Sequence, residues 1–450
     1  MASKDSETSV SASGRPLRTR ITFYRGIRTI GGNLIDVEYG DSHILFDFGT
    51  VYKPAEPQQP SNLPDLVDLG YVPYIEGIFD RDIPVPGHDW HPDPHAHAAV
   101  FISHAHLDHS KMINYIDRDI PLYASVQTKA VLEAMNTTDD FDYPPYAIER
   151  GEGGPHTRPI EGVAWGHSVQ VGQIKVTVLQ VDHDAYGASG FRIETPDKAI
   201  AYTGDIRFHG FLADRSRAFL SANAGADALI MEGTSLSFRK PGGCGNDDKP
   251  TETSVCEDIA QLVASNPDRQ ITFNYYLTNI ERIGHLIDAI DRTTVLSDYA
   301  AYVFSAVTGR PVHYYRSECD CTCGELDPEY EISLADLIHD DHQYFWQLDD
   351  AVRGAHLDDL ARGGLYIHTG ATPLGPYDPS YAPFFQAFAD HGIETEAISC
   401  TGHAYVDAAF SIIDAIKPHV LFPVHGEHPE RYFNQYGSMV LPEPGLVVEL

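Results

Sequence analysis

The chain has 450 residues, 42% of them hydrophobic, and a formal net charge of −34 with only nine lysines. This length exceeds the usual limit of a single core, so we expect two domains or one large domain with an insertion. No apolar run reaches the roughly 18 residues that cross a bilayer, which excludes a transmembrane helix. The acidic surface on average repels polyanions, which counts against a nucleic-acid substrate.

Residues 1–19 are rich in serine and have no apolar segment, which predicts a disordered tail rather than a signal peptide. The cysteine spacing suggests no secreted disulfide framework, and together these features favour the cytoplasm. Cys319, Cys321 and Cys323 alternate in an acidic segment. Because zinc sites usually contain CxxC pairs, we interpret this cluster as a solvated loop rather than a metal site.

The first half of the chain predicts a series of strands. Residues 21–49 alternate in the manner of strands joined by glycine-rich turns, and a proline-rich irregular stretch follows. The apolar run 98–102 predicts a buried strand that ends where a histidine cluster begins. Further strands are predicted within 168–184, 198–205 and 227–234, and each range ends at or near an acidic residue.

From about residue 252 the pattern alternates between helices and strands. Residues 253–266 and 279–292 have helical spacing, and a strand is predicted at 271–277 between them. This alternation is typical of a parallel sheet. An acidic segment at 318–360 predicts solvated helix and loop, and three more strands are predicted within 363–370, 392–404 and 419–429.

Histidine and aspartate side chains gather where the predicted strands end. They are His104, His106, Asp108, His109, His183, Asp205, His403 and His425. Ligands of α/β sheets collect at the carboxyl ends of strands, so we expect these side chains to converge. Nitrogen and oxygen donors without thiolate suit zinc or a similar metal. Six or seven donors are too many for one tetrahedral ion and fit two ions roughly 3.5–4 Å apart.

These motifs carry a resemblance to a known fold. The run "HAHLDH" at 104–109 is similar to the HxHxDH signature of the metallo-β-lactamase fold, with "LFDFG" upstream and His183 and Asp205 following in the expected order. Glu232 in "MEGT", His403 in "TGHA" and His425 in "PVHGE" resemble the three further motifs of the β-CASP branch. Together with "YYLTNIERIGHLI", they make residues 22–450 most similar to ribonuclease J.

The resemblance implies an α/β fold, a metallo-β-lactamase αββα sandwich with an inserted parallel α/β domain of the β-CASP type. The expected order is the tail at 1–19, the first part of the sandwich at 20–240, the inserted domain at 241–365 and the return segment at 366–450. Leu107 stands where the family commonly has an acidic residue. Because this position is not a ligand, we expect metal binding to be unaffected.

The resemblance also implies a role for each site residue. One divalent ion, zinc or manganese, is held by His104, His106 and His183. The other is held by Asp108, His109 and His425, and Asp205 bridges the two. A hydroxide activated by the metals then attacks phosphorus. His403, oriented by Glu232, is the candidate general acid. Asp108 counts with His403 and Glu232 as catalytic, and a neighbouring phosphate is assigned to Thr278, Asn279 and Arg282.

The leading hypothesis is a ribonuclease J-like phosphodiesterase acting on single-stranded RNA. One alternative is a hydrolase of the same fold that cleaves a small ester, lactone or amide. A second is a non-catalytic RNA-processing scaffold, although such proteins typically lose ligands and this chain keeps the whole set. No membrane partner is expected. The sequence does not decide whether the substrate is RNA or DNA, or whether cleavage is endonucleolytic or exonucleolytic. It also does not decide whether the protein forms a homo-oligomer.

Four residues outside the ligand set have other expected positions. Asp47 is expected to support the site rather than bind metal. His95 and His97 precede a predicted strand, so we expect them in a surface loop. His368 fits either the wall of the site or the core.

Five arginines gather near the start of the chain, with Phe23 and Tyr24 among them. They are Arg15, Arg18, Arg20, Arg25 and Arg28. Aromatic rings between arginines suit base stacking along RNA. The same run also fits a disordered tail that leads into an edge strand, and the sequence does not decide between the two.

Overall fold

The computed structural model describes residues 16–51, 53–55, 60, 62–138, 159–238, 249–318, 324–339 and 342–450. The predicted tail lies outside the described residues as far as residue 15, and so does the cysteine cluster at 319–323. Thr19, at the end of the predicted tail, is buried and donates a hydrogen bond to Asp197 at 2.5 Å. Among the described residues, no helix is long and apolar enough to cross a membrane.

The first sheet has seven strands in the order β20-β1-β2-β3-β4-β5-β6. They are β20 (Leu446–Glu449), β1 (Arg20–Arg25), β2 (Leu34–Tyr39), β3 (Ser42–Phe46), β4 (His97–Phe101), β5 (Leu122–Ser125) and β6 (Glu161–Val163). β2 and β3 form a hairpin whose turn contains Gly40 at φ 65°, a conformation that favours glycine. From β3 onward the strands pair in parallel, so the ends of β3 and β4 meet at one edge.

The second sheet also has seven strands, in the order β19-β18-β11-β10-β9-β8-β7. They are β19 (Ser438–Met439), β18 (Val420–Val424), β11 (Ala228–Glu232), β10 (Ala199–Tyr202), β9 (Ser189–Glu194), β8 (Ile174–Gln180) and β7 (Ser168–Val171). β18 joins the sheet by pairing in parallel with β11, which precedes it by almost 190 residues. This pairing returns the end of the chain to the sheet that residues 168–232 begin.

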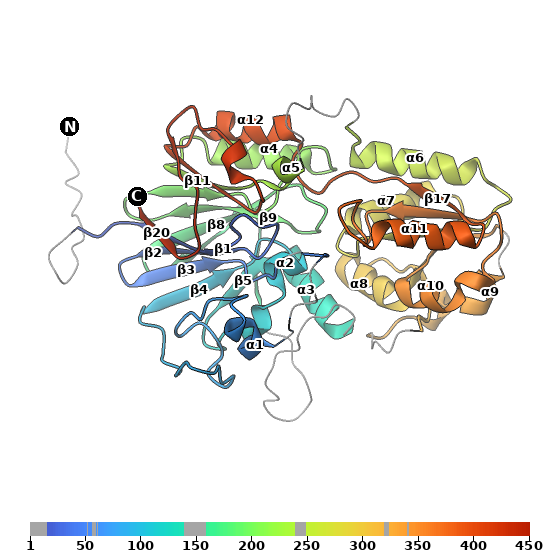
Figure 1. Cartoon of the computed structure of the whole chain (residues 1–450), viewed down its shortest axis with the longest axis horizontal. Helices are drawn as coiled ribbons and strands as arrows, with labels where there is room; N and C mark the ends of the chain where they lie inside the picture. The colour runs from blue at the N-terminus through green and yellow to red at the C-terminus, as the bar shows by residue number, and fades with distance from the viewer. Residues whose placement is uncertain are drawn as a thin grey trace.

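The two sheets pack face to face around a shared apolar core (Figure 1). Phe46 and Phe101 of the first sheet contact Phe191 of the second, with ring centroids 5.0 and 6.0 Å apart. Helices α4 (Ala213–Ala222) and α12 (Val406–Ile416) cover the outer face of the second sheet, and α1 (Leu63–Asp68), α2 (Leu107–Ser110) and α3 (Val126–Thr138) lie on the side of the first. The predicted αββα sandwich is confirmed.

A third, fully parallel sheet lies beside the sandwich, at the right of Figure 1. Its order is β14 (His313–Tyr315), β13 (Thr293–Ser297), β15 (Tyr344–Gln347), β12 (Ile271–Tyr275), β16 (Leu365–Thr369) and β17 (Glu394–Ala397). Its helices are α6 (Glu252–Ala264), α7 (Ile280–Ala289), α8 (Asp298–Thr308), α9 (Leu334–Ile338), α10 (Asp350–His356) and α11 (Tyr381–Asp390). The predicted inserted α/β unit is thus present.

The third sheet extends further along the chain than the predicted boundary at 365. β16 and β17 belong to it, and the chain rejoins the second sheet only through α12 and β18. On this topology we propose that the inserted unit ends near residue 397 rather than 365. Short elements complete the chain, namely α5 (Thr234–Ser237), η1 (Ile113–Tyr115), η2 (Pro328–Tyr330), η3 (Leu357–Asp359) and η4 (Pro429–Arg431).

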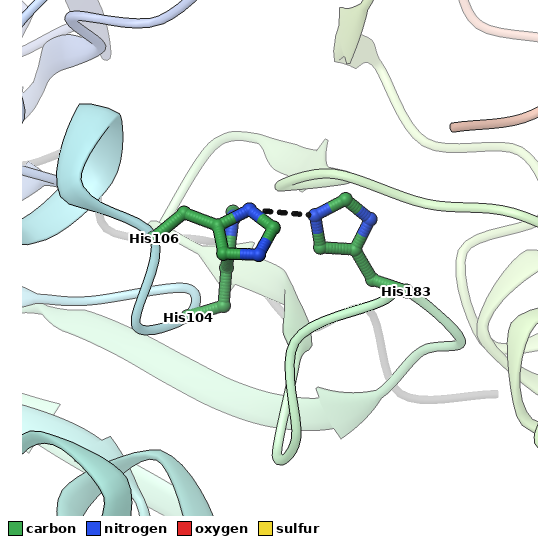
Figure 2. Close-up of side chains that lie close together, drawn as sticks. All are labelled: His104, His106 and His183. Atoms are coloured by element: carbon green, nitrogen blue, oxygen red, sulfur yellow. Dashed lines mark hydrogen bonds between the residues drawn. The ribbon is translucent and has the colours of Figure 1, made fainter. Parts of the chain in front are cut away.

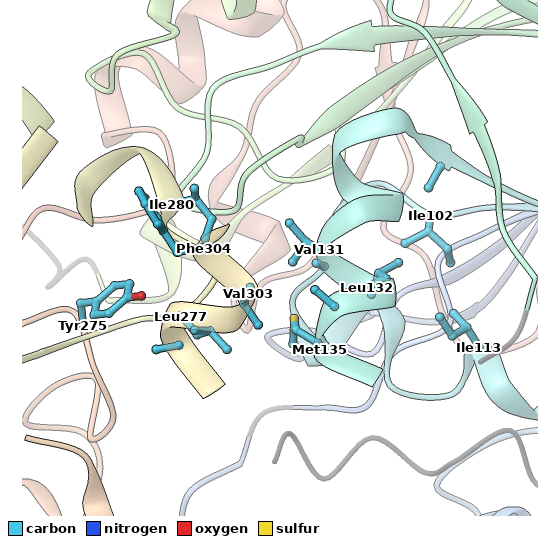
Figure 3. Close-up of a cluster of buried hydrophobic side chains, with 14 of the residues drawn as sticks. Ile102, Ile113, Val131, Leu132, Met135, Tyr275, Leu277, Ile280, Val303 and Phe304 are labelled. Atoms are coloured by element: carbon cyan, nitrogen blue, oxygen red, sulfur yellow. The ribbon is translucent and has the colours of Figure 1, made fainter. Parts of the chain in front are cut away.

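The inserted unit and the sandwich share a continuous apolar core. Figure 3 shows Val131 and Met135 of α3 facing Val303 of α8, and all three side chains are essentially buried. Because burial of each such side chain contributes about 1.5–3 kcal/mol, this contact fixes the inserted unit against the first sheet. The edge of the third sheet is therefore held close to the edge where β3 and β4 end.

The described part of the arginine run, which excludes Arg15, contributes β1 to the first sheet of the sandwich. β1 pairs with β20 on one side and β2 on the other, so it is not an edge strand. Phe23 is buried, with its ring 5.0 Å from that of Phe422. Arg20 pairs with Glu38, and Arg28 pairs with Glu430 at 2.9 Å. Base stacking on Phe23 is excluded because its ring is part of the core.

Candidate metal centre

The "HAHLDH" motif follows β4 and runs directly into α2. Gly49, after β3, lies so close that an added Cβ would stand 1.7 Å from the carbonyl oxygen of Asp108. The backbone NH of Phe48 donates to the carbonyl of His109 at 2.7 Å. These contacts fix the histidine-rich turn against the segment that contains Asp47.

Three histidines form the first group of possible ligands. His104 and His106 come from the motif, and His183 approaches from the segment after β8 (Figure 2). His183 Nε2 lies 3.2 Å from His106 Nδ1, and the ligand atoms of all three lie within 4.8 Å of one another. This spacing suits one ion bound by three imidazole nitrogens.

A second group of possible ligands contains Asp108, His109 and His425. His425 follows β18, and its Nε2 lies 3.1 Å from Asp108 Oδ2. His425 has a positive φ of 50°, which is uncommon for a residue other than glycine. Such backbone strain clusters at functional sites, where surrounding contacts maintain it.

Asp205 lies between the two groups. Its Oδ2 is 3.7 Å from His104 and from His183 in the first group, and 3.3 Å from His109 and 3.6 Å from His425 in the second. This near-equal spacing is what a carboxylate bridging two ions requires.

The buried atoms of this cluster test whether a metal fits. Both oxygens of Asp205 are buried and have no hydrogen-bond partner among the described residues, and the same holds for Nε2 of His104 and of His109. Burial alone raises the pKa of Asp205, but the charges of His425 and His109 hold it well below its usual range. Leaving a buried carboxylate without a partner is costly, so the residues fit bound cations.

Each imidazole has one nitrogen turned into the cluster and the other held by an oxygen outside it. His109 Nδ1 donates to Asp47 at 2.9 Å, which confirms the supporting position predicted for that carboxylate. His183 Nδ1 donates to the carbonyl of Gly402 at 2.5 Å. Such partners fix the tautomer and orientation of a metal-binding histidine.

Two threonines hold other histidines in the same way. His106 Nε2 lies 2.9 Å from Thr278 Oγ1, so the inserted unit contacts a possible ligand directly. His425 Nδ1 lies 2.7 Å from Thr234 Oγ1, whose hydroxyl donates to the carbonyl of His425 at 3.2 Å. The role of Thr234 was not predicted from the sequence, although this residue directly follows the "MEG" run.

His403 and Glu232 lie together, as the general-acid hypothesis requires. His403 Nδ1 is 3.1 Å from Glu232 Oε1 and 3.8 Å from Asp205 Oδ2. Burial alone lowers the pKa of His403, but the charges of Glu232 and Asp205 raise it to about 9. Glu232 thus stabilises the protonated form of the imidazole, which is partly open to solvent, and both features suit proton donation.

A cavity of about 890 Å³ opens in front of the cluster, between the sandwich and the third sheet. Asp108, Asp205 and His403 line it on one side, and Asn274 and Gln347, at the ends of β12 and β15, line it on the other. In open α/β sheets, ligands bind outside the carboxyl ends of the strands. Both units thus contribute to one binding space.

The three residues assigned to a phosphate do not line this cavity. The guanidinium of Arg282 donates to Glu252 at 2.8 Å through both Nε and Nη2, and its Nη1 donates to the carbonyl of Thr369 at 2.8 Å. Asn279 donates to Glu252 at 3.2 Å, and its own Oδ1 caps the start of α7. Arg282 and Asn279 therefore join elements of the protein, and their buried positions place them away from a ligand.

Arg207 completes this buried network and connects it to the metal cluster. Its guanidinium donates to Glu252 at 2.8 Å and to Asp182 at 3.1 Å. It also donates to the backbone carbonyls of His183 at 3.0 Å and Thr401 at 3.3 Å. The network therefore holds the segments that present two of the imidazoles.

Four further side chains have defined positions in the structure. Asp184 lines the cavity, and its Oδ1 lies 3.3 Å from His183 Nε2. His368 is buried, with Nδ1 3.1 Å from the hydroxyl of Tyr366, so it belongs to the core. His95 lies in the loop before β4, as expected, but it is half-buried and stacks on His43, whereas His97 is the exposed first residue of β4.

Comparison with known proteins identifies a domain and several relatives. Residues 77–270 match the model of the beta-lactamase superfamily domain. A solved structure described as a protein of unknown function from Enterococcus faecalis V583 is 38% identical, with a TM-score of 0.87, and the match covers 96% of this chain and 100% of that one.

Curated relatives include proteins named ribonuclease J. That of Mycolicibacterium smegmatis is 22% identical over 430 residues, which cover 90% of this chain and 68% of that protein. That of Mycoplasma pneumoniae is 22% identical over 279 residues, which cover 60% of this chain and 42% of that protein. The chain thus spans only part of the length of these relatives.

Proposed function

We propose that this metal-dependent hydrolase, which belongs to the metallo-β-lactamase superfamily, is a β-CASP phosphodiesterase that cleaves single-stranded RNA in the cytoplasm. The observation that carries the proposal is the convergence of six possible ligands around Asp205, at the floor of a cavity that both units line. The likeness to proteins named ribonuclease J over 90% of the chain supports RNA as the substrate.

The ligand set supports two ions, most simply zinc. We assign one to His104, His106 and His183, the other to Asp108, His109 and His425, and the bridging position to Asp205. When bound, such a pair lowers the pKa of a water molecule and stabilises negative charge on phosphoryl oxygens. Asp47, Thr234 and Thr278 keep the imidazoles oriented. The protein thereby supplies a preorganised site whose ligands need not move.

His403 is the group that we assign to proton transfer. Its Nδ1 is held by Glu232, so its Nε2 is the atom that donates to the oxygen leaving phosphorus. Glu232 is a positioning residue, since it acts through the imidazole. General acid catalysis of this kind contributes about 10²–10⁴ in rate.

Exposed aromatic rings near the cluster suit an unpaired strand. Phe238 of the sandwich and Tyr377 of the inserted unit stack with centroids 5.0 Å apart, and both line the cavity. Each is more than 40% exposed. Bases of single-stranded nucleic acid stack on such rings with little sequence preference, each contact contributing about 1–3 kcal/mol.

A second candidate, a small-molecule ester, lactone or amide hydrolase, is favoured by the charge of the cavity. Among the described lining residues, Lys111 is the one lysine or arginine, whereas Asp184, Asp349 and Asp350 add negative charge beyond the ligand set. A polyanion normally requires several phosphate contacts. If the substrate is RNA, the bound cations contact its phosphates and the aromatic rings stack on its bases, in place of a row of lysine and arginine side chains.

Hydrolysis assays on one set of substrates distinguish the two candidate functions. The full chain, loaded with zinc or manganese, is offered single-stranded RNA, single-stranded DNA of the same sequence, bis-p-nitrophenyl phosphate and a series of lactones. We expect RNA cleavage, its loss in Asp205→Asn, and its retention in Asp214→Asn, which alters an exposed aspartate of α4.

Cleavage of a lactone or ester with no cleavage of either nucleic acid would overturn the proposal in favour of the small-molecule hydrolase. Equal cleavage of DNA and RNA would keep the phosphodiesterase and reject RNA specificity. Activity that survives Asp205→Asn would show that the chemistry lies elsewhere in the molecule.

A further inference from the structure

A second cluster of imidazoles and carboxylates lies on the first sheet, away from the catalytic cavity. His43 is near the start of β3, and Asp93 and His95 lie in the segment before β4. His43 precedes Asp47 by four residues, which is about 13 Å along an extended strand. The cluster is therefore separate from the site that Asp47 supports.

One nitrogen of each imidazole points at the same carboxylate. His43 Nε2 lies 2.6 Å from Asp93 Oδ2, and His95 Nδ1 lies 3.0 Å from Asp93 Oδ1. The two rings stack with centroids 4.1 Å apart, and the ligand atoms of the three residues lie within 4.8 Å of one another. Donors of a tetrahedral zinc site, each about 2.1 Å from the ion, lie about 3.4 Å apart. The three side chains therefore need only small shifts to bind one ion.

The far nitrogen of His43 has the partner that metal-binding histidines usually have. His43 Nδ1 lies 3.2 Å from Asp36 Oδ2, and the side chains of both residues are almost fully buried. The other oxygen of Asp36 is buried without a hydrogen-bond partner among the described residues. A carboxylate behind the imidazole fixes the tautomer that presents Nε2 to an ion.

The charge balance of the cluster also favours a cation. Asp36, Glu38 and Asp93 bring three negative charges, and Arg20, which pairs with Glu38, neutralises one. With neutral imidazoles, two negative charges remain, which equals the charge of one divalent ion.

We propose that His43, Asp93 and His95 bind one zinc ion at a site separate from the catalytic cavity. Two imidazole nitrogens and a carboxylate oxygen are typical zinc donors. Glu38, whose Oε2 lies 3.8 Å from His95 Nε2, borders the site on its solvent side. A bound ion would join the segment before β4 to the hairpin of β2 and β3, so its role is structural.

The zinc content of the full chain tests the proposal. Wild type and His95→Gln are saturated with zinc, desalted and measured by plasma mass spectrometry. We expect His95→Gln to hold one ion per chain fewer than wild type. His97→Gln, the same change at an exposed position two residues along, should match wild type. The test compares the zinc content of the two proteins and does not use the total. Its outcome therefore does not depend on how many ions the catalytic cavity binds.

A second measurement uses the unaltered protein and does not depend on the folding of a variant. Anomalous scattering at the zinc edge from wild-type crystals should give a peak between His43 and His95. Equal zinc content in wild type and His95→Gln, or no peak at this position in zinc-saturated crystals, would overturn the proposal. The cluster would then be an ion pair held by protons alone.

Discussion

Replacing Glu252 with glutamine should lower the free energy of unfolding by about 3 kcal/mol at neutral pH. Glu252 is the first residue of α6, its side chain is 0% exposed, and it accepts hydrogen bonds from both Arg207 and Arg282. Glutamine keeps the shape of the side chain but removes its charge. Arg207 would then keep Asp182 as a carboxylate partner at 3.1 Å, whereas Arg282 would lose the carboxylate with which it pairs.

The expected loss of about 3 kcal/mol follows from the pKa of Glu252 and, independently, from the cost of breaking a buried ion pair. Burial alone raises the pKa of Glu252, but the charges of Arg282 and Arg207 lower it from the ordinary 4.5 to about 2. A difference of that size corresponds to about 3 kcal/mol. Independently, removing one partner of a buried ion pair costs about 3–5 kcal/mol.

Equilibrium urea unfolding at fixed salt measures the effect. Glu257→Gln is the matched control because Glu257 lies on the same helix but is exposed, and its effect should stay within about 0.5 kcal/mol. The folded-state pKa of Glu252 is depressed, so its stabilisation is complete above the unfolded value of 4.5 and is lost as pH falls towards about 2. The difference between wild type and Glu252→Gln should therefore shrink below about pH 4.5. Equal stability of the two variants, or a difference that persists undiminished in acid, would refute the reasoning.

Three further changes test the metal cluster and its chemistry. Asp205→Asn should release both ions together, as measured by metal content per chain, and loss of only one would show that Asp205 is a terminal ligand. His403→Ala should slow RNA cleavage by about 10²–10⁴-fold while the metal content stays intact. Cleavage of a p-nitrophenyl phosphodiester should slow less, because its leaving group needs no proton. An equal loss of rate on both substrates would show that His403 is not the general acid. Thr278→Val keeps the shape but loses the hydrogen bond to His106, so zinc affinity in a chelator competition should fall about 10–100-fold, and an unchanged affinity would show that the contact is incidental.

The fold could be predicted because its signals are local. Each strand that presents a possible ligand is a short apolar run with the ligand at its end, as at His104 after β4 and Asp205 after β10. The order of these motifs then predicted the superfamily, and residues 77–270 match the model of its domain. The extent of the inserted unit was harder to predict because β16 carries His368 near its end and so resembles the strands of the sandwich that end at a histidine.

What the sequence could not predict are partnerships between distant residues. Arg282, beside Asn279 at the start of a helix, has the pattern of a phosphate ligand, but its partner Glu252 stands 30 residues earlier. His43 and Asp93 are 50 residues apart and share no motif, so the second imidazole cluster was not foreseen. Such pairings depend on which helices and strands pack against one another in the folded chain. The spacing of residues within a short segment does not predict them.

The pairing of β18 with β11 has a consequence for how the protein forms during synthesis. Residues 168–232 leave the ribosome long before residues 420–424, so the second sheet waits with one edge open while almost 190 residues are added. The third sheet is made from the contiguous stretch 271–397 and can close in that interval. His425 emerges after every other possible ligand. At the proposed site, metal would thus be captured as one of the last events, and a chain interrupted before that point should lack both a complete ligand set and a complete second sheet.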